Sequence, residues 1–534
     1  MTATVETRLG ALQGIQRTNH IEFRGIPYAK PPVDELRFQA PQPLSPWQGI
    51  KRADRFGDAS IQENISLFGV GSISEDCLYL NVWTPSLNTN EKNIDETKRP
   101  VMVWIHGGGY ISGSGSQLIY RGRELCENGD MVVVTINYRL GVLGFLDLTQ
   151  YFSSDLPVSA NNGLLDQIAA LQWVKDNILA FGGDPDQVTV FGESAGGMSI
   201  AALMASPLSK GLFNRAIIQS GSGDHVLTKE EATQVTDCFL QETGVSSDDP
   251  DALFTLSTKQ IIKAQKKCLS LSFDRGSQQQ RVPQFGMTLV PVIDGDILPT
   301  TPIRAIENGA ASEIALMAGA TRDEWNLFLH TPGPEGDSLA KTHYKHLNKS
   351  DLIKICERDL PGLGEKSANL YESVILSRAE SDAESNGDSS TALPTGAALD
   401  MYSAFESDRM FRIPTLRLAE AQSRHRDDVY MFEFEWDKGV FGACHAVDIP
   451  FVFGATQGGF GQILTGGSNK AAELSSTVQS CWVAFARSGN PGTDRVGQWP
   501  GYSTNNRKVM CFDVDTRIVE DPQGTTRGHW DGIL

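Results

Sequence analysis

The sequence is short of positive charge, short of cysteine and without long apolar runs. Its 534 residues carry 46 Lys and Arg against 65 Asp and Glu, a formal net charge of −19. An acidic surface repels nucleic-acid phosphates and anionic lipid headgroups, so we set aside DNA, RNA and membrane surfaces as partners. Purely apolar runs, such as residues 131–134, are far shorter than the roughly 18 residues that cross a bilayer. We therefore expect no transmembrane helix.

The eight cysteines are sparse and show no CxxC spacing. Residues 1–8 carry charge and lack the apolar stretch of about 7–15 residues that marks a secretory signal. Both features indicate a reducing compartment in which thiols stay free, and we expect a cytoplasmic protein. No fixed-period repeat is present, which argues against solenoids and propellers.

What the sequence does contain is an alternation of strand and helix patterns. Residues 101–105 and 131–136 are continuous apolar runs, typical of parallel strands buried on both faces. A helical pattern follows at 163–180, then a strand at 188–191 and a helix at 195–205. Such alternation predicts an α/β fold with right-handed crossovers. Later strands are predicted at residues 216–219, 314–319 and 430–436.

Residues 377–395 differ from the rest of the chain in composition. They are rich in Ser, Asp, Glu, Asn and Gly, with almost no large apolar side chain. This composition predicts a mobile loop inserted into the fold and not a domain boundary, so residues 1–534 are expected to form one domain. The loop could serve as a lid or, as is more common, form a solvated surface segment.

The segment Gly192-Glu193-Ser194-Ala195-Gly196 fits the pattern G-x-S-x-G, where a predicted strand meets a predicted helix. In such a tight turn only glycine fits on either side, and the serine hydroxyl is lifted out of the sheet. The N–H groups of the following helix then point toward that hydroxyl. The pattern alone also fits a packing turn. Its position makes Ser194 a candidate nucleophile.

A glycine triplet provides the second half of a possible acyl-transfer site. His106-Gly107-Gly108-Gly109 follows another predicted strand, where glycines leave N–H groups open toward a developing oxyanion. Together with Ala195 this predicts an oxyanion hole with donors from Gly108, Gly109 and Ala195. His106 is expected to brace the loop. The stretch matches neither nucleotide-binding pattern, G-x-G-x-x-G or G-K-[ST].

A serine nucleophile needs a base, and the base needs a carboxylate that fixes its tautomer. Asp323 and Glu324 follow one predicted strand, and His445 follows a later one. The order serine, acid, histidine is that of the α/β-hydrolase fold. The residues alone leave the choice between Asp323 and Glu324 open.

Many further segments have the sequence and spacing of one known family. They are residues 23–32, 36–38, 74–81, 101–110, 137–141, 162–199, 323–324, 445–454 and 485–491. Over nearly its whole length the chain resembles the type B carboxylesterase family, and within it most of all the bacterial para-nitrobenzyl esterases. The family also includes the cholinesterases. The resemblance implies an α/β-hydrolase fold, with a mostly parallel sheet and helical insertions around the active-site entrance.

The resemblance also assigns roles to residues. It selects Glu324 as the acid, beside Ser194 and His445, and it aligns Glu193 and Ser220 with positions that flank the triad. For Glu193 and Ser220, a supporting role and simple buried hydrogen bonding remain equally open. It implies hydrolysis of small to medium aryl and alkyl esters without metal or organic cofactor. The oligomeric state, monomer or homodimer, stays undetermined.

Three departures from the family pattern narrow this interpretation. Cys77 matches a cysteine that pairs with an upstream partner in secreted members, but no cysteine precedes it here. Cholinesterases have a tryptophan about ten residues before that cysteine, and its ring holds the quaternary ammonium group of choline by a cation–π contact. In this chain Leu67 lies near the corresponding position. Choline esters are therefore not expected as substrates. Trp325 replaces the glycine usual after the acid.

Two alternatives to the esterase hypothesis remain. The same site could hydrolyse amides or carbamates, which only matched substrates would reveal. A non-catalytic binding module could use the same fold, since a fold does not fix a function. Relatives of that kind typically lose the nucleophile, whereas Ser194, Glu324 and His445 are all present.

Overall fold

The apolar runs of the sequence form the centre of one large sheet in the computed structural model, which describes residues 1–63, 69–88, 98–152, 156–271, 287–331, 337–386 and 396–533. The strands are β1 (Thr2–Thr7), β2 (Gly10–Gln16), β3 (Ile21–Pro27), β4 (Ile50–Arg52), β5 (Tyr79–Thr84), β6 (Arg99–Ile105), β7 (Val132–Ile136), β8 (Gly183–Glu193), β9 (Arg215–Gln219), β10 (Ala315–Thr321), β11 (Val429–Phe434), β12 (Lys508–Phe512) and β13 (Arg517–Glu520). Among the described residues their order is β1-β2-β3-β5-β7-β6-β8-β9-β10-β11-β12-β13, with β4 paired to β2.

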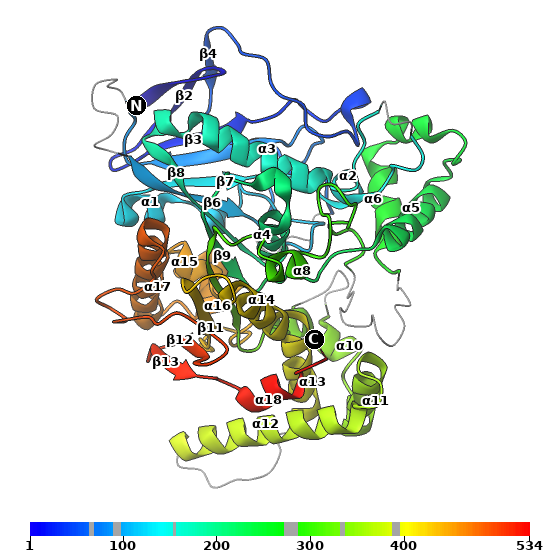
Figure 1. Cartoon of the computed structure of the whole chain (residues 1–534), viewed down its shortest axis with the longest axis vertical. Helices are drawn as coiled ribbons and strands as arrows, with labels where there is room; N and C mark the ends of the chain where they lie inside the picture. The colour runs from blue at the N-terminus through cyan, green and yellow to red at the C-terminus, as the bar shows by residue number, and fades with distance from the viewer. Residues whose placement is uncertain are drawn as a thin grey trace.

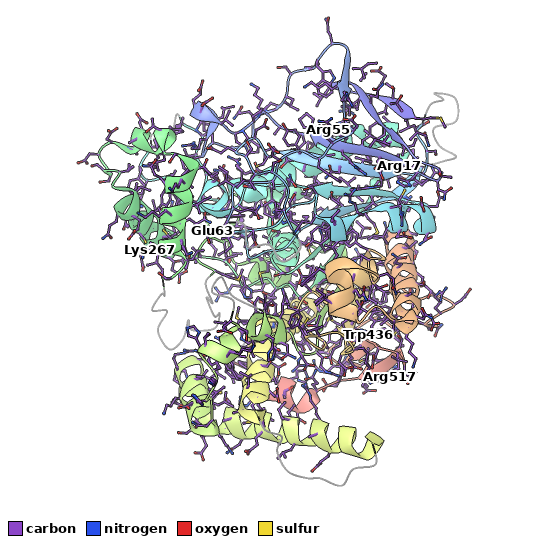
Figure 2. All side chains as sticks on the ribbon, turned by 180° about the vertical axis from the view of Figure 1, so that it is seen from behind. Arg17, Arg55, Glu63, Lys267, Trp436 and Arg517 are labelled. Atoms are coloured by element: carbon purple, nitrogen blue, oxygen red, sulfur yellow. The ribbon has the colours of Figure 1, made fainter. Side chains whose placement is uncertain are left out.

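Neighbouring strands from β7 to β12 all pair in parallel, which confirms the predicted parallel centre. Antiparallel pairs are added at both edges, by β1, β2, β3 and β5 on one side and by β13 on the other. The two edges of the sheet lie far apart. In Figure 2, Arg17 and Arg55 mark the part of the molecule near the first strands, and Trp436 and Arg517 mark the part near β11 and β13, beyond which α12 extends further.

Helices cover both faces of the sheet (Figure 1). They are α1 (Arg123–Gly129), α2 (Gly141–Phe145), α3 (Asn162–Asn177), α4 (Ala195–Ala205), α5 (Lys229–Thr243), α6 (Thr258–Cys268), α8 (Pro302–Glu307), α9 (Asn326–His330), α10 (Leu339–Thr342), α11 (Lys349–Asp359), α12 (Gly364–Asn386), α13 (Ala397–Ser407), α14 (Ile413–Ser423), α15 (Ile449–Val452), α16 (Gly459–Thr465), α17 (Asn469–Ser488) and α18 (Gly524–His529). Helices α3, α4, α8 and α14 pack in succession on one face, while α1, α15 and α17 pack together on the other.

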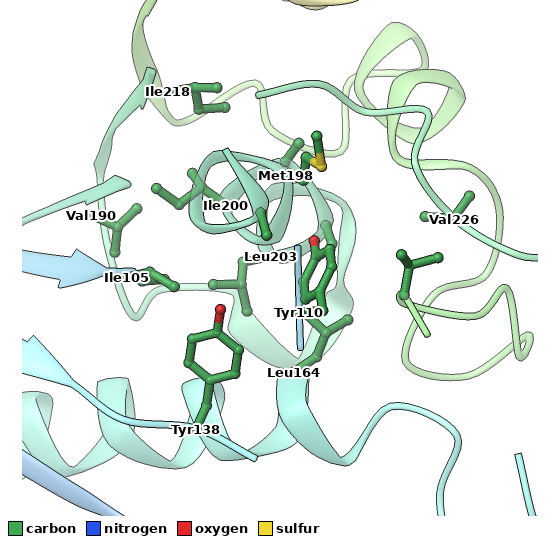
Figure 3. Packing of buried hydrophobic residues seen from close by; sticks show 14 of the residues in the cluster. Ile105, Tyr110, Tyr138, Leu164, Val190, Met198, Ile200, Leu203, Ile218 and Val226 are labelled. Atoms are coloured by element: carbon green, nitrogen blue, oxygen red, sulfur yellow. The ribbon is translucent and has the colours of Figure 1, made fainter. Parts of the chain in front are cut away.

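Alternate side chains of the central strands enter two separate cores. Ile105, Val190 and Ile218 face helix α4, as Figure 3 shows, whereas Phe191 and Ile217 belong to the core under α17. Because both faces are covered, nearly every position of such a strand is apolar, which explains the near-continuous apolar runs. The sheet thus fixes the carboxyl ends of β6, β8, β9, β10 and β11 relative to one another, and the predicted site residues follow these strands.

The predicted elements agree with the structure in type, and one segment differs. Residues 377–386, expected to begin a loop, form the last part of α12. Ser, Glu and Ala are acceptable in a helix, and the scarcity of apolar side chains does not prevent helix formation in a chain already helical from Gly364. Residues 387–395 of the same predicted loop lie outside the described residues.

Two further findings apply to the described part of the chain. None of its helices combines the length and apolar character needed to cross a membrane. None of its His, Cys, Asp and Glu side chains gather in groups of three or more that could hold a metal ion.

Candidate active site

Ser194 lies on a strained turn between β8 and α4. Its φ of 56° and ψ of −126° are uncommon for a residue with a side chain. The Ser194 N–H donates to the carbonyl of Gln219 at 2.9 Å, which fixes the turn against β9. A Cβ added to Gly196 would lie 2.0 Å from the Ile105 carbonyl oxygen, and one added to Gly192 would lie 2.7 Å from it. The tight turn that the motif predicted therefore requires both glycines.

His445 and Glu324, which are 121 residues apart, meet beside this turn. The Nδ1–H of His445 donates to Glu324 Oε2 at 2.5 Å. The other carboxylate oxygen, Oε1, accepts from the Ser220 hydroxyl at 2.5 Å and from the Thr321 N–H at 2.8 Å. Glu324 is fully buried. Three hydrogen bonds thus hold the carboxylate, and the carboxylate holds the imidazole ring.

The neighbouring acid Asp323 points elsewhere. Its carboxylate accepts from Arg322 at 2.9 Å and from Arg378 at 2.8 Å. Of the two candidates that the residues left open, only Glu324 contacts His445. Both residues lie in the turn after β10, where their side chains leave the backbone in different directions, so a one-residue difference separates the two roles.

The other ring nitrogen of His445 faces a second carboxylate. Its Nε2 lies 2.9 Å from Glu193 Oε1, at ion-pair distance but without hydrogen-bond geometry. Among the described residues, no hydrogen bond joins Ser194 Oγ to His445. Burial by itself lowers the pKa of His445, but Glu193 and Glu324 together raise that pKa to about 10. For the acid Glu193, burial has the opposite effect and raises the pKa.

A third buried acid, Asp448, lies behind this pair and was missed in the sequence. Its Oδ2 accepts from Gln219 Nε2 at 2.7 Å. Burial and the nearby Glu193 raise the pKa of Asp448 to about 7. Asp448 follows His445 by three residues, and this closeness in the sequence was the one signal that could have pointed to a place near the site.

The glycine triplet forms an open turn beside Ser194. Gly108 and Gly109 have φ values of 107° and 61°, which favour glycine. Within the described chain, no acceptor receives a hydrogen bond from either N–H. The Ala195 N–H is also unpaired within its helix, because the first turn has no preceding carbonyl. All three predicted oxyanion donors are therefore available for a ligand.

His106 holds the start of this turn. Its Nδ1–H donates to the Gly107 carbonyl at 2.8 Å, and its ring stacks on Tyr138 with centroids 4.5 Å apart. The Tyr138 hydroxyl donates to the His106 carbonyl at 2.8 Å. Burial lowers the pKa of His106 to about 4. A neutral, buried imidazole fits the bracing role expected of it.

A cavity of about 330 Å³ opens over Ser194 and His445. Most of its wall is apolar: Ile111, Met198, Met287, Trp325, Leu327, Phe328, Met410, Phe411 and Ala446. Phe328 and Phe411 contact the His445 ring, with centroids 5.1 Å and 4.5 Å away. Trp325, which departs from the family pattern, is buried and forms part of this wall.

The other two departures have different outcomes. Cys77 is a buried free thiol. Leu67, which lies near the position of the cholinesterase tryptophan, is outside the described residues.

Known proteins resemble this chain over its full length. The model of the carboxylesterase family matches residues 1–528. The para-nitrobenzyl esterase of Bacillus subtilis (strain 168) is 38% identical over 530 residues, 98% of this chain and 97% of that protein. Phenmedipham hydrolase of Pseudarthrobacter oxydans is 30% identical over 533 residues, 96% of each. A solved carboxylesterase of Geobacillus stearothermophilus superposes with a TM-score of 0.83 at 35% identity, covering 99% of both chains.

Proposed function

Since the chain belongs to the carboxylesterase family, it is a carboxylic ester hydrolase of the α/β-hydrolase fold, and we propose that Ser194, His445 and Glu324 carry out its reaction. The observation that carries this proposal is the 2.5 Å hydrogen bond from His445 to the buried Glu324, beside a serine on a strained turn. A nucleophile, a base and an acid that orients the base are the parts that acyl transfer requires.

In the first half of the reaction Ser194 Oγ attacks the ester carbonyl carbon. His445 Nε2 takes the hydroxyl proton, and Glu324 stabilises the resulting imidazolium. When the tetrahedral intermediate collapses, the carbon–alkoxide bond breaks and His445 gives its proton to the leaving alcohol. In the second half, His445 deprotonates a water that attacks the acyl-enzyme, which releases the acid and restores Ser194.

The oxyanion formed in both halves is stabilised by the N–H groups of Gly108, Gly109 and Ala195. No acceptor among the described residues takes these N–H groups, which supports this role. Removal of one such donor typically lowers turnover by about 10²–10³-fold. No metal or organic cofactor is needed for these steps.

Glu193 and Ser220 support the triad. The Ser220 hydroxyl fixes Glu324 through its 2.5 Å hydrogen bond. Glu193 faces His445 Nε2 in the resting enzyme, so the imidazole has to turn this nitrogen toward Ser194 before it can accept the proton. Glu193 thereby stabilises the protonated base and sets how readily it becomes neutral.

The substrates are small to medium aryl and alkyl esters. Sulfur, aromatic and aliphatic groups line most of the cavity, whose volume of about 330 Å³ suits ligands of that size. The para-nitrobenzyl esterase that resembles this chain is named for an ester with an aromatic ring in its alcohol part. Three methionines in the wall, Met198, Met287 and Met410, can adapt to different acyl and alcohol groups.

The decisive experiment is hydrolysis of short p-nitrophenyl esters by the wild-type protein and by Ser194→Ala, with a chelator present. We expect wild-type turnover to persist with chelator and to fall by about 10³-fold or more in the variant. Equal activity of the two proteins would show that Ser194 is not the nucleophile.

Covalent labelling separates the remaining alternatives. A fluorophosphonate should attach to Ser194 of the wild-type protein and leave Ser194→Ala unlabelled. An unlabelled and inactive wild-type protein would instead favour a binding module on this fold. Rates on a matched ester and anilide then determine whether ester or amide hydrolysis dominates.

We also propose that residues 1–534 form one catalytic domain, as the family match over residues 1–528 and a single sheet from β1 to β13 support. A cytoplasmic location is consistent with eight cysteines that are all free thiols. Titration of the unfolded protein without reductant should find eight reactive thiols, and fewer would argue for an oxidising compartment.

A further inference from the structure

The buried side chain of Gln62 binds the far end of the glycine turn through hydrogen bonds to Gly113. Gln62 Oε1 accepts the N–H of Gly113 at 2.8 Å, and its Nε2 donates to the Gly113 carbonyl at 2.9 Å and to the Ser60 carbonyl at 3.0 Å. The side chain is 2% exposed. Two opposed hydrogen bonds from one side-chain amide to the N–H and the carbonyl of the same residue fix orientation as well as distance. The amide group thus has a partner on its oxygen and two on its nitrogen.

Gly113 packs closely against the start of the turn that carries the predicted oxyanion donors. Its φ is 108°, and a Cβ there would lie 2.5 Å from His106 Nδ1 and 2.6 Å from the Gly107 carbonyl oxygen. Between Gly107 and Gly113 the chain folds back on itself, because the Gly108 carbonyl accepts hydrogen bonds from the N–H groups of Ile111 at 3.1 Å and Ser112 at 3.0 Å. The turn from residue 107 to 113 is therefore joined by its own hydrogen bonds and held at its far end by Gln62.

A glycine turn needs such an outside contact for a physical reason. Glycine loses more conformational freedom on folding than any other residue, yet oxyanion donors work only when they are already in place before the charge develops. The N–H groups of Gly108 and Gly109 have no acceptor within the described chain that could hold them. Their direction must then be set by neighbouring contacts of the turn.

Gln62 is itself anchored. The Ser60 hydroxyl accepts the Leu140 N–H at 3.1 Å, and Ala59 forms a bridge with Ile73. Glu63 lies 3.5 Å from Lys266 of α6, on the side of the molecule where Figure 2 labels Glu63 and Lys267. The segment that carries Gln62 is therefore anchored to the core through Ser60, and the exposed Glu63–Lys266 pair adds little to that.

We propose that Gln62 is a positioning residue for ester hydrolysis: it holds the turn from Gly107 to Gly113 so that the N–H groups of Gly108 and Gly109 meet the oxyanion. The inference rests on the proposed function, because it assumes that these N–H groups form the oxyanion hole. Gln62 acts through Gly113 and does not touch the reacting atoms.

The test replaces the amide without changing its size. Gln62→Met removes all three hydrogen bonds, and Gln62→Glu keeps the acceptor but sets a carboxylate oxygen against the carbonyls of Gly113 and Ser60. For p-nitrophenyl esters we expect kcat to fall by about 10–100-fold, less than loss of a whole donor, with KM within about threefold. A folded variant with wild-type kcat would overturn the proposal.

A transition-state mimic gives a readout that a purely structural role would not change. When a trifluoromethyl ketone reacts, Ser194 Oγ bonds to the carbonyl carbon, the π bond breaks to leave an oxyanion, and the hydroxyl proton moves to His445. We expect its affinity for both Gln62 variants to fall by the same factor as kcat. Affinity for the unreactive methyl ketone should be unchanged. Equal losses for both ketones would show that Gln62 shapes the cavity and not the oxyanion hole.

Gln422 provides a matched control. It is fully buried, and its Nε2 donates to the carbonyls of Ala311 at 2.8 Å and Ile314 at 2.7 Å, outside the cavity wall. Gln422→Met should lower the unfolding temperature but leave kcat per folded molecule unchanged. If Gln62→Met behaves like Gln422→Met, Gln62 only stabilises the fold. If Ser194→Ala retains full activity, the proposed function itself is wrong, whatever the Gln62 variants do.

Discussion

At the scale of single residues, the chemistry of His445 is decided by its neighbours. Burial alone would keep the ring neutral, but carboxylates on both sides outweigh that effect and raise its pKa to about 10. Since this value exceeds that of an unfolded histidine, about 6.5, protonated His445 adds stability that is complete below pH 6.5. That stability is lost as pH rises through about 10. To act as a base, His445 must first lose its proton, and its ion pairs with Glu193 and Glu324 oppose that loss.

The Glu193→Gln variant tests this balance. Removal of one carboxylate should lower the pKa of His445, so the acid-side inflection of kcat/KM should move to lower pH. Activity near neutral pH would then retain a larger fraction of its maximum. The pH profile of p-nitrophenyl ester hydrolysis measures the shift, with Glu193→Asp as the charge-preserving control. An unchanged inflection would mean that Glu193 does not influence the base.

The two adjacent acids should differ sharply on mutation. Glu324→Gln keeps the size but removes the charge that holds the Nδ1–H tautomer, and we expect kcat to fall by roughly 10²–10⁴-fold. Asp323→Asn should change kcat by less than about threefold, since that carboxylate pairs with Arg322 and Arg378. Steady-state kinetics of the two variants decide the assignment. The opposite ranking would make Asp323 the acid.

At the scale of elements, the junction of β8 and α4 illustrates why a glycine inside a helix can be indispensable. Helix propensity alone favours alanine over glycine by roughly 0.5–1 kcal/mol. At Gly196 the added Cβ would lie 2.0 Å from the Ile105 carbonyl oxygen, a backbone atom that cannot turn away. Packing overrides propensity here.

Gly196→Ala should therefore push α4 away from β6 and displace Ser194. A misplacement of about 1 Å is enough to lower turnover roughly 10²-fold, and overpacking destabilises by about 1–3 kcal/mol. The control is Gly528→Ala in α18, where a Cβ would meet open space, so stability should rise or stay unchanged. Thermal unfolding and ester hydrolysis of both variants test this. If the two alanines behaved alike, propensity and not packing would control the turn.

At the scale of the whole molecule, a buried ion pair joins the sheet region to α3. Arg139 donates to Asp166 through Nε and Nη2, both at 2.7 Å, and through Nη1 to the Gln39 carbonyl at 2.6 Å. Both side chains are at most 2% exposed. A guanidinium without its acid in such a place is an uncompensated buried charge.

Asp166→Asn should lower the free energy of unfolding by about 3–5 kcal/mol. Asp176→Asn on the same helix removes an exposed pair with Arg8, and should change it by no more than about 1 kcal/mol. Urea unfolding curves give both values. Similar losses would mean that burial does not determine the strength of these pairs.

The sequence by itself determined the order of strands and helices, because continuous apolar runs and helical periodicity are local consequences of burial on both faces. It also predicted the tight turn at Ser194 and the glycine turn, since close backbone contacts at Gly196 and positive φ values at Gly108 and Gly109 call for glycine, and each feature lies within a few adjacent residues. The family predicted from the motifs is confirmed by the comparisons. The segment 377–386 was assigned wrongly, because composition alone does not separate a polar helix from a loop.

Only the tertiary structure decided the contacts between distant segments. The residues themselves left Asp323 and Glu324 open and the family resemblance selected Glu324, but only the structure shows the contact of Glu324 with His445, which depends on how the chain leaves β10. Glu193 facing His445 Nε2 and Gln62 holding Gly113 join segments 252 and 51 residues apart. Polar contacts of this kind depend on distances of a few tenths of an ångström, and those distances are set when the whole sheet and both of its helical layers pack together.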